Sequence, residues 1–416
     1  MTKIKKINAL EILDSRGNPT VKAIVMLENG ILGSAAVPSG ASKGRYEVLE
    51  LRDKDIRYGG LGVLIACENI NKIIAKKITG FDIADQKKID EALIELDGTK
   101  NKSNLGANAI LAVSLASCRA AAKSENIPLY QYLAKTFQFK KPANIPTAFF
   151  NVLNGGAHSD SGLSIQEFQI IPHKFVNFSE KLQAASEIFH KLKNIFANAG
   201  FSVGVGDEGG FAPKLESNIE ALDYIKKAIE EAKYNFQETV SIGIDAAASN
   251  FFNGNQISYT LKPENISLGT DQLIVLYQEW KKKYNLFSVE DGLTEDDFES
   301  WKIINEKMGS DMLIIGDDLL ATNKDRLEKA LSFSAINAAI VKPNQIGTLT
   351  ETIKFIKKCQ KNKIKVVVSH RSGETEDSFI ADLAVAVGAE YVKFGAPCRG
   401  ERTVKYNRLV EIQEEI

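Results

Sequence analysis

Three carboxylates each close a short apolar run in the second half of the chain. Asp245, Glu290 and Asp317 follow stretches rich in isoleucine, valine and phenylalanine. A single carboxylate after a strand is often the N-cap of the next helix, and Asp245 alone fits that structural role equally well. Three at successive strand ends, without histidine or cysteine, form an oxygen-rich set that suits Mg²⁺.

Basic side chains continue the same pattern along the chain. Lys342 follows the next apolar run, His370 and Arg371 follow the one after, and Lys393 lies in the last. Lysines at such positions are often solvated, which is the structural alternative. A lysine facing a bound metal ion would have its proton affinity lowered by the positive charge. It could then act as a general base near neutral pH.

Polar loops rich in glycine or serine supply further candidates. Glu208 lies in an acidic loop, His158 in a loop that leads to Glu167, and Ser42 in a serine- and glycine-containing segment near the N-terminus. A carboxylic acid held on a loop could serve as a general acid. The structural alternatives are a solvated turn, a hydrogen-bonded histidine and a plain surface loop.

The elements that would position these groups are short apolar runs separated by amphipathic helical segments, such as 218–232 and 271–284. This alternation predicts parallel βαβ units. About eight such strands predict a closed α/β barrel, in which the strand ends would bring the candidate residues to one rim. An open doubly wound sheet is the structural rival, but no Gly-x-Gly-x-x-Gly follows the first strand, so dinucleotide binding is unsupported. The expected strands lie at 148–153, 168–171, 241–244, 286–289, 313–315, 338–341, 366–368 and 391–394.

The N-terminal part has a different pattern. Segments in which apolar and polar residues alternate predict two strands, joined by a turn cluster. A polar loop follows, and then helical patterns. A stretch with two prolines and two lysines at 136–146 marks a boundary. We therefore expect an α+β domain at 1–134 and a catalytic α/β barrel domain at 143–416. Within the first domain, strands are expected at 3–13 and 20–27, and helices at about 60–78, 84–95 and 107–123.

Composition limits the classes of partner. The 416 residues include 52 basic and 53 acidic ones, so the chain has no global field that would hold nucleic acid or an anionic membrane surface. No signal peptide or membrane-spanning run is expected. The four cysteines match no zinc or redox spacing, which favours reduced thiols and a cytoplasmic protein.

Nine segments, in order along nearly the whole chain, resemble enolase motifs. This resemblance implies an N-terminal α+β capping domain and a C-terminal enolase-type α/β (TIM-like) barrel that begins with two strands and two helices. The segments are 13–20 (LDSRGNPT), 38–42 (PSGAS), 50–53 (ELRD), 105–109 (LGANA), 205–210 (VGDEGG), 288–293 (SVEDGL), 316–319 (GDDL), 342–347 (KPNQIG) and 369–377 (SHRSGETED).

The resemblance also implies an activity, the reversible dehydration of 2-phospho-D-glycerate to phosphoenolpyruvate in glycolysis and gluconeogenesis. This lyase would use two Mg²⁺ per active site to stabilise an aci-carboxylate intermediate. By position, a lysine base, a glutamate acid with two neighbours, four metal ligands and a substrate-binding group are implied. They are, in turn, Lys342; Glu208 with Glu167 and His158; Asp245, Glu290, Asp317 and Ser42; and His158, Glu167, Lys342, His370, Arg371, Ser372 and Lys393.

Two alternatives stay beside this interpretation. One is another member of the wider superfamily that acts on a different carboxylate, which would not be expected to carry the Ser42 loop, Glu208 and the 369–372 group together. The other is an enolase-like binding protein, whose signature would be the loss of a metal ligand or of Lys342. The family resemblance implies a homodimer or an octamer, and a secondary cell-surface or secreted fraction. The sequence departs from the common pattern at Lys22, Lys43, Asn250 and Phe394.

Overall fold

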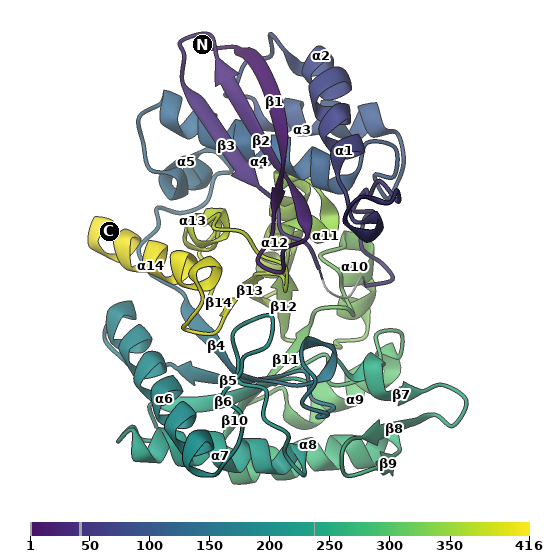
Figure 1. Cartoon of the computed structure of the whole chain (residues 1–416), viewed down its shortest axis with the longest axis vertical. Helices are drawn as coiled ribbons and strands as arrows, with labels where there is room; N and C mark the ends of the chain where they lie inside the picture. The colour runs from purple at the N-terminus through teal and green to yellow at the C-terminus, as the bar shows by residue number, and fades with distance from the viewer. Residues whose placement is uncertain (1, 41–43, 237) are drawn as a thin grey trace.

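The first part of the chain is a small sheet packed against helices (Figure 1). The computed structural model describes residues 2–40, 44–236 and 238–416. Strands β1 (Ile4–Leu13), β2 (Pro19–Leu27) and β3 (Leu32–Ala36) form an antiparallel sheet. The helices that follow are η1 (Arg57–Gly60), α1 (Leu64–Glu68), the π-helical η2 (Asn69–Ile74), α2 (Ala75–Ile78), α3 (Gln86–Asp97), α4 (Ala107–Ser124) and α5 (Leu129–Thr136).

Helix α4 is the centre of this part. It is apolar around most of its circumference and almost entirely buried, as expected of a helix enclosed on several sides. It packs against β2 and β3. A Cβ atom at Gly33 would lie 2.3 Å from the Ala116 carbonyl oxygen and 2.3 Å from the Ala120 nitrogen. Only glycine therefore allows β3 to approach the helix this closely.

The second part is a closed barrel of eight strands in the order β10-β11-β12-β13-β14-β4-β5-β6. Each of the eight predicted apolar runs is one of these strands. They are β4 (Thr147–Asn154), β5 (Glu167–Pro172), β6 (Val240–Asp245), β10 (Leu286–Glu290), β11 (Leu313–Gly316), β12 (Ala338–Val341), β13 (Lys365–Ser369) and β14 (Tyr391–Gly395).

The expectation of parallel units throughout was wrong for one strand. Strand β5 pairs antiparallel with both β4 and β6, whereas the other neighbours in the barrel pair parallel. The connection from β4 to β5 contains only a loop and the short η3, which cannot carry the chain back across the barrel as a helical crossover would. The predicted start of two strands and then two helices is confirmed, because α6 and α7 follow β5.

Helices surround the barrel, and a small three-stranded sheet lies outside it (Figure 1). This antiparallel sheet, formed by β7 (Phe252–Asn253), β8 (Ser258–Leu261) and β9 (Ile266–Leu268), was not predicted. The helices are η3 (Gly156–His158), α6 (Phe178–Asn198), α7 (Asn218–Glu231), η4 (Ala248–Phe251), α8 (Thr270–Tyr284), α9 (Phe298–Met308), α10 (Lys324–Ser332), α11 (Pro343–Ile346), α12 (Leu349–Lys361), α13 (Phe379–Ala386) and α14 (Gly400–Glu415). None of the described helices is both long and apolar enough to cross a membrane.

The barrel interior is filled at one end by side chains that form a separate apolar cluster, which includes Phe149, Ile171, Ile315 and Val367. This packed floor fits the general rule that such barrels are solid cores rather than pores. The other end of the interior carries charged side chains. A reactive site inside the barrel is therefore expected at that other end.

The N-terminal part lies against that rim. Ser39 and Gly373 form an isolated antiparallel bridge, in which each backbone N–H donates to the other residue's carbonyl oxygen. Arg119 of α4 makes a two-pronged ion pair with Asp377, with both nitrogen–oxygen distances 2.6 Å. These contacts join the first 130 or so residues to the loop after β13.

Candidate active site

The predicted chemistry-bearing residues meet at one rim of the barrel. Asp245 and Glu290 are paired residues at the ends of β6 and β10. Asp317 and Lys342 directly follow β11 and β12, and Lys393 lies in β14. All five side chains are largely buried, and they line or border one polar cavity.

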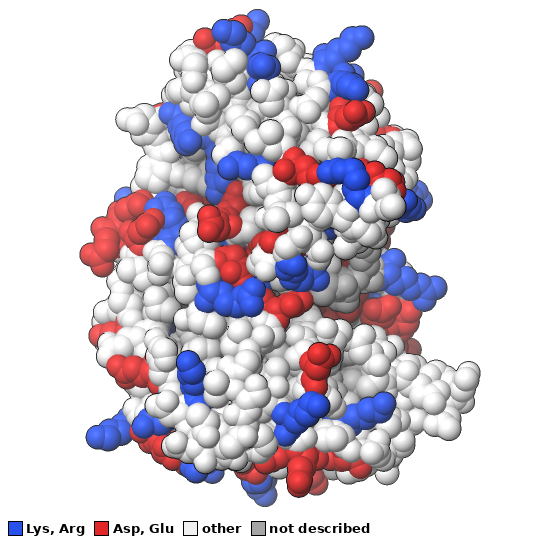
Figure 2. Space-filling view, viewed as in Figure 1, with Lys and Arg blue, Asp and Glu red and all other residues white. Residues whose placement is uncertain are grey.

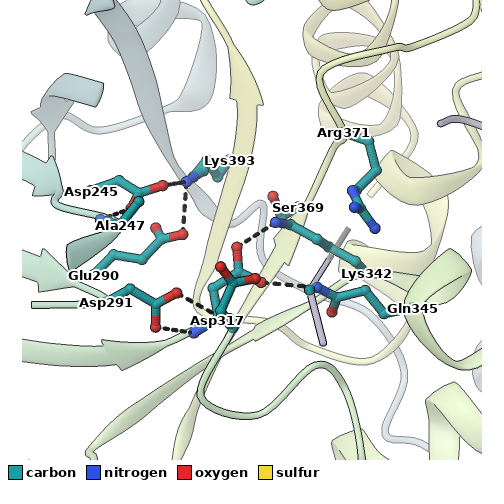
Figure 3. A network of polar contacts seen from close by, with 12 residues as sticks. Asp245, Ala247, Glu290, Asp291, Asp317, Lys342, Gln345, Ser369, Arg371 and Lys393 are labelled. Carbon is teal, nitrogen blue, oxygen red and sulfur yellow. Dashed lines mark hydrogen bonds and ion pairs between the residues drawn. The ribbon is translucent and has the colours of Figure 1, made fainter. Parts of the chain in front are cut away.

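Lys393 is the hub of the first group of contacts. Its Nζ donates to Asp245 Oδ2 at 2.9 Å and to Glu290 Oε1 at 2.8 Å (Figure 3). It also lies 3.0 Å from Glu167 Oε1. Burial alone would lower the pKa of Lys393, but these carboxylates hold it well above its ordinary value. Lys393 therefore stays charged in this arrangement.

Lys342 makes the second group of contacts. Its Nζ donates to Asp317 Oδ2, and Asp317 Oδ1 accepts a hydrogen bond of 3.1 Å from Gln345 (Figure 3). Burial would lower the pKa of Lys342, but the Asp317 charge raises it. Burial would raise the pKa of Asp317, but the charge of Lys342 lowers it below its ordinary value. A lysine base at this place is therefore protonated as long as Asp317 keeps its full negative charge.

Oxygen ligands for a hard cation are abundant. Among the described residues, one carboxylate oxygen from each of Asp291, Asp317 and Asp318 can be chosen so that all lie within 4.8 Å of one another. Glu290 Oε2 is buried, and no hydrogen-bond partner for it exists in the described part of the chain. An all-oxygen donor set with an orphaned buried carboxylate oxygen fits Mg²⁺ or a similar ion.

A second cluster lies beside the first. His158, Glu167 and Glu208 also bring one ligand atom each within 4.8 Å of one another. Glu208 accepts a hydrogen bond of 3.0 Å from Asn151 and lies 3.4 Å from His158 Nδ1. Burial would raise the pKa of Glu208, but the neighbouring histidines lower it well below its ordinary value. Burial and the Glu208 charge raise the pKa of Glu167 to about 8, so Glu167 rather than Glu208 carries a proton of this cluster at neutral pH.

The loop after β13 supplies donors. Ser372 Oγ lies 3.3 Å from His158 Nε2 and donates to Glu208 Oε1 at 3.3 Å. The Arg371 guanidinium forms a forked pair with Glu47 at 2.8 and 3.1 Å. Such a planar fork is suited to carboxylate or phosphate oxygens.

The structure brings together every sequence-predicted site residue that it describes. Ser42 lies outside the described residues. Sequence reasoning missed Glu47, Gln166, Asp291 and Asp318, which line the same cavity. Asp291 and Asp318 directly follow the predicted Glu290 and Asp317, so adjacency at a strand end was an available signal. Glu47 carries no such signal, because it reaches the site only through the packing of the two parts.

Comparisons with known proteins cover nearly the whole chain. Residues 4–133 match the family model described as the N-terminal domain of enolase. Residues 142–416 match the one described as its C-terminal TIM barrel domain. A relative named enolase from a Nitratiruptor species is 49% identical over 416 residues, which is 100% of this chain and 97% of the relative. Another relative named enolase, from Natranaerobius thermophilus, is also 49% identical, over 100% of this chain and 96% of the relative.

Proposed function

The chain belongs to the enolase family, and we propose that it catalyses the reversible dehydration of 2-phospho-D-glycerate to phosphoenolpyruvate, a step of glycolysis and gluconeogenesis. The reaction removes the proton from C2 and the hydroxyl from C3, and releases water. It needs a base on one side of the substrate, an acid on the other, and positive charge around the carboxylate and the phosphate. The arrangement of residues supports each of these needs.

Mg²⁺ is the cofactor that we propose, with two ions in each active site. Asp245, Glu290 and Asp317 would hold the first ion, and Ser42 would help to hold the second. When bound, the two ions supply positive charge that stabilises the extra negative charge of the aci-carboxylate formed from the substrate. Asp317 would then attract the Lys342 proton less strongly, which lowers the pKa of that lysine toward the range of a useful base.

Lys342 is the proposed base, and Glu208 the proposed acid. Lys342 would take the C2 proton, and Glu208 would deliver a proton to the departing C3 hydroxyl. His158 and Glu167 lie beside Glu208, which supports their role as its partners. Because the pKa of Glu167 is raised to about 8 and that of Glu208 is lowered, the proton would pass from Glu167 to Glu208 before it reaches the leaving hydroxyl. The aci-carboxylate needs a counter-charge near the base, which Lys393 provides from its buried position.

The phosphate end of the cavity is proposed to lie at the loop after β13. Arg371 offers its fork, Ser372 a hydroxyl and His370 a ring N–H. Together with His158, Glu167, Lys342 and Lys393, these would bind the substrate. The Glu47 carboxylate already accepts hydrogen bonds from both terminal nitrogens of Arg371. A phosphate would therefore bind the guanidinium beside this carboxylate or in its place.

The finer organisation is also proposed. We place an α+β domain at 1–134 and the catalytic barrel at 143–416. We further propose a cytoplasmic protein that forms a homo-oligomer, a dimer or an octamer, and that binds no nucleic acid. Figure 2 shows acidic and basic side chains interspersed on one face of the molecule, in keeping with the net charge of -1.

The observation that carries the proposal is the convergence of a lysine, a glutamate–histidine cluster and a set of carboxylates that could hold a cation on one buried cavity in an enolase-family chain. The test is ultraviolet absorbance of the purified protein with 2-phospho-D-glycerate, first with Mg²⁺ and then with excess chelator. We expect a rise from phosphoenolpyruvate that chelator abolishes and added Mg²⁺ restores. Folded protein that gives no rise with Mg²⁺ would contradict the proposal.

A further inference from the structure

Arg402 is a buried arginine behind the site that none of the proposed catalytic roles uses. It lies in the first turn of α14 and has no exposed surface. Its Nη1 donates to His370 Nδ1 at 2.5 Å and to the Arg371 carbonyl oxygen at 2.6 Å. Its Nη2 donates to the carbonyl oxygens of Ser372 at 2.6 Å and Asp207 at 3.1 Å. One guanidinium thus ties the loop after β13 to the loop that carries Glu208.

The contact with His370 decides where the imidazole proton lies. A guanidinium can only donate hydrogen bonds, so the Nδ1 atom beside Arg402 must accept with its lone pair. The proton of the neutral ring is then on Nε2. That atom is buried, lies 3.8 Å from Glu208 Oε1, and has no hydrogen-bond partner in the part of the chain that the structure describes.

We propose that Arg402 is a positioning residue that holds His370 in the Nε2–H tautomer, with this N–H directed at an anionic group of the substrate. The identification of that group as the phosphate rests on the proposed function. The tautomer itself does not. In the opposite tautomer His370 would direct a lone pair at an anion, and a donor would become a source of repulsion.

The surroundings of His370 keep the ring neutral. Burial lowers the pKa of His370 well below its ordinary value, and the charges of Arg402, Lys393 and Lys342 act in the same direction. The Glu208 carboxylate opposes them. A neutral donor binds an anion without bringing a charge of its own that depends on pH, so Arg402 and Arg371 supply the positive charge.

The direct test is nitrogen NMR of the full-length protein labelled with ¹⁵N-histidine, without substrate. The chain has four histidines, so a His370→Gln variant assigns the signal of interest. We expect an unprotonated Nδ1 and a protonated Nε2 for His370 throughout the neutral pH range. In Arg402→Gln, which removes the charge and most donors, we expect a mixture of tautomers or a ring that becomes protonated on acidification. Arg402→Lys is the second variant, because it keeps the charge but cannot satisfy all four acceptors.

Arg408→Gln is the matched control. Arg408 lies on the same helix and pairs with Asp382 at 2.9 Å, away from the cavity. Its loss should leave the His370 signals unchanged. A protonated Nδ1 in the wild-type protein, or unchanged His370 signals in both Arg402 variants, would overturn the inference even if 2-phospho-D-glycerate is turned over.

Kinetics give an independent readout. If Arg402 acts through His370, we expect Arg402→Lys and His370→Ala each to lower kcat/KM by about 10- to 100-fold, as for loss of one hydrogen bond to a charged group. The double variant should lose little more than either single one. Fully multiplicative losses would contradict action through His370. If the tautomer responds to Arg402 but no dehydration occurs, the positioning inference stands and the proposed substrate fails.

Discussion

A buried carboxylate at the junction of the two parts should make stability depend on pH. Asp90 of α3 is fully buried and accepts hydrogen bonds from Gln86 Nε2 at 3.0 Å and from the Thr350 backbone N–H at 2.8 Å. Thr350 lies in the first turn of α12, where helix N–H groups lack partners within the helix. Burial raises the pKa of Asp90 from 3.8 to about 6.

The sign and size follow from linkage between protonation and folding. The pKa is higher in the folded than in the unfolded chain, so the stabilising contribution is fully present below about pH 4. It is lost as the pH rises through about 6, where the folded protein must bury a charge. A shift of roughly 2 pKa units corresponds to about 3 kcal/mol of unfolding free energy, since each unit is worth 1.36 kcal/mol.

Asp90→Asn keeps the shape of the side chain and removes the titration. We expect the unfolding free energy of the variant, relative to wild type, to rise by about 2 kcal/mol between pH 4 and pH 7, which is most of the total. Urea unfolding followed by circular dichroism at several pH values measures this difference. Glu91→Gln is the control, because Glu91 is an exposed carboxylate on the same helix. A difference for Asp90→Asn that stays flat across this range would refute the reasoning from burial.

Three further outcomes are expected. Lys342→Ala should abolish exchange of the C2 proton while phosphoenolpyruvate binding stays detectable, and retained exchange in NMR would exclude Lys342 as the base. Glu208→Gln should keep C2 exchange but lose dehydration, because the acid acts after proton abstraction; loss of both would show that Glu208 is not simply the leaving-group acid. Asp377→Asn should lower the unfolding free energy by about 2 kcal/mol, less than for a fully buried pair because Arg119 keeps 19% of its side-chain exposure. An unchanged urea midpoint would show that this ion pair adds nothing to the attachment of the two parts.

The barrel was predictable because its strands are buried on both faces. Runs such as 338–341 are apolar at every position, and the strand there has these same bounds. The antiparallel direction of β5 was not predictable from its apolar residues, because a buried strand has the same apolar pattern whichever way it runs. Only the absence of a helical segment between β4 and β5 pointed to it.

The site residues that lie at strand ends were predictable. Contacts between side chains that depend on tertiary packing were not. The spacing of Asp317 and Lys342 placed both at the rim, but not their direct ion pair. That pair raises the pKa of Lys342, contrary to what a base needs, so the lowered pKa expected from the sequence requires a cation at Asp317. Glu47 was missed because it reaches the cavity from a distant segment, and Arg402 because it lies behind the cavity and contacts His370 from the far side.

The small N-terminal part contacts two segments of the barrel that carry proposed site residues. The Leu349 N–H donates to Ser114 Oγ at 3.1 Å, next to the bond that Asp90 accepts, so α3 and α4 cap the helix that follows the Lys342 segment. Glu47 accepts two hydrogen bonds from Arg371 in the loop after β13. The proposed base and the proposed phosphate-binding arginine are therefore both held from the same side. Without this part the barrel would still contain the carboxylates proposed to bind the metal, but it would lose the contacts that fix both loops, and catalysis tolerates little such displacement.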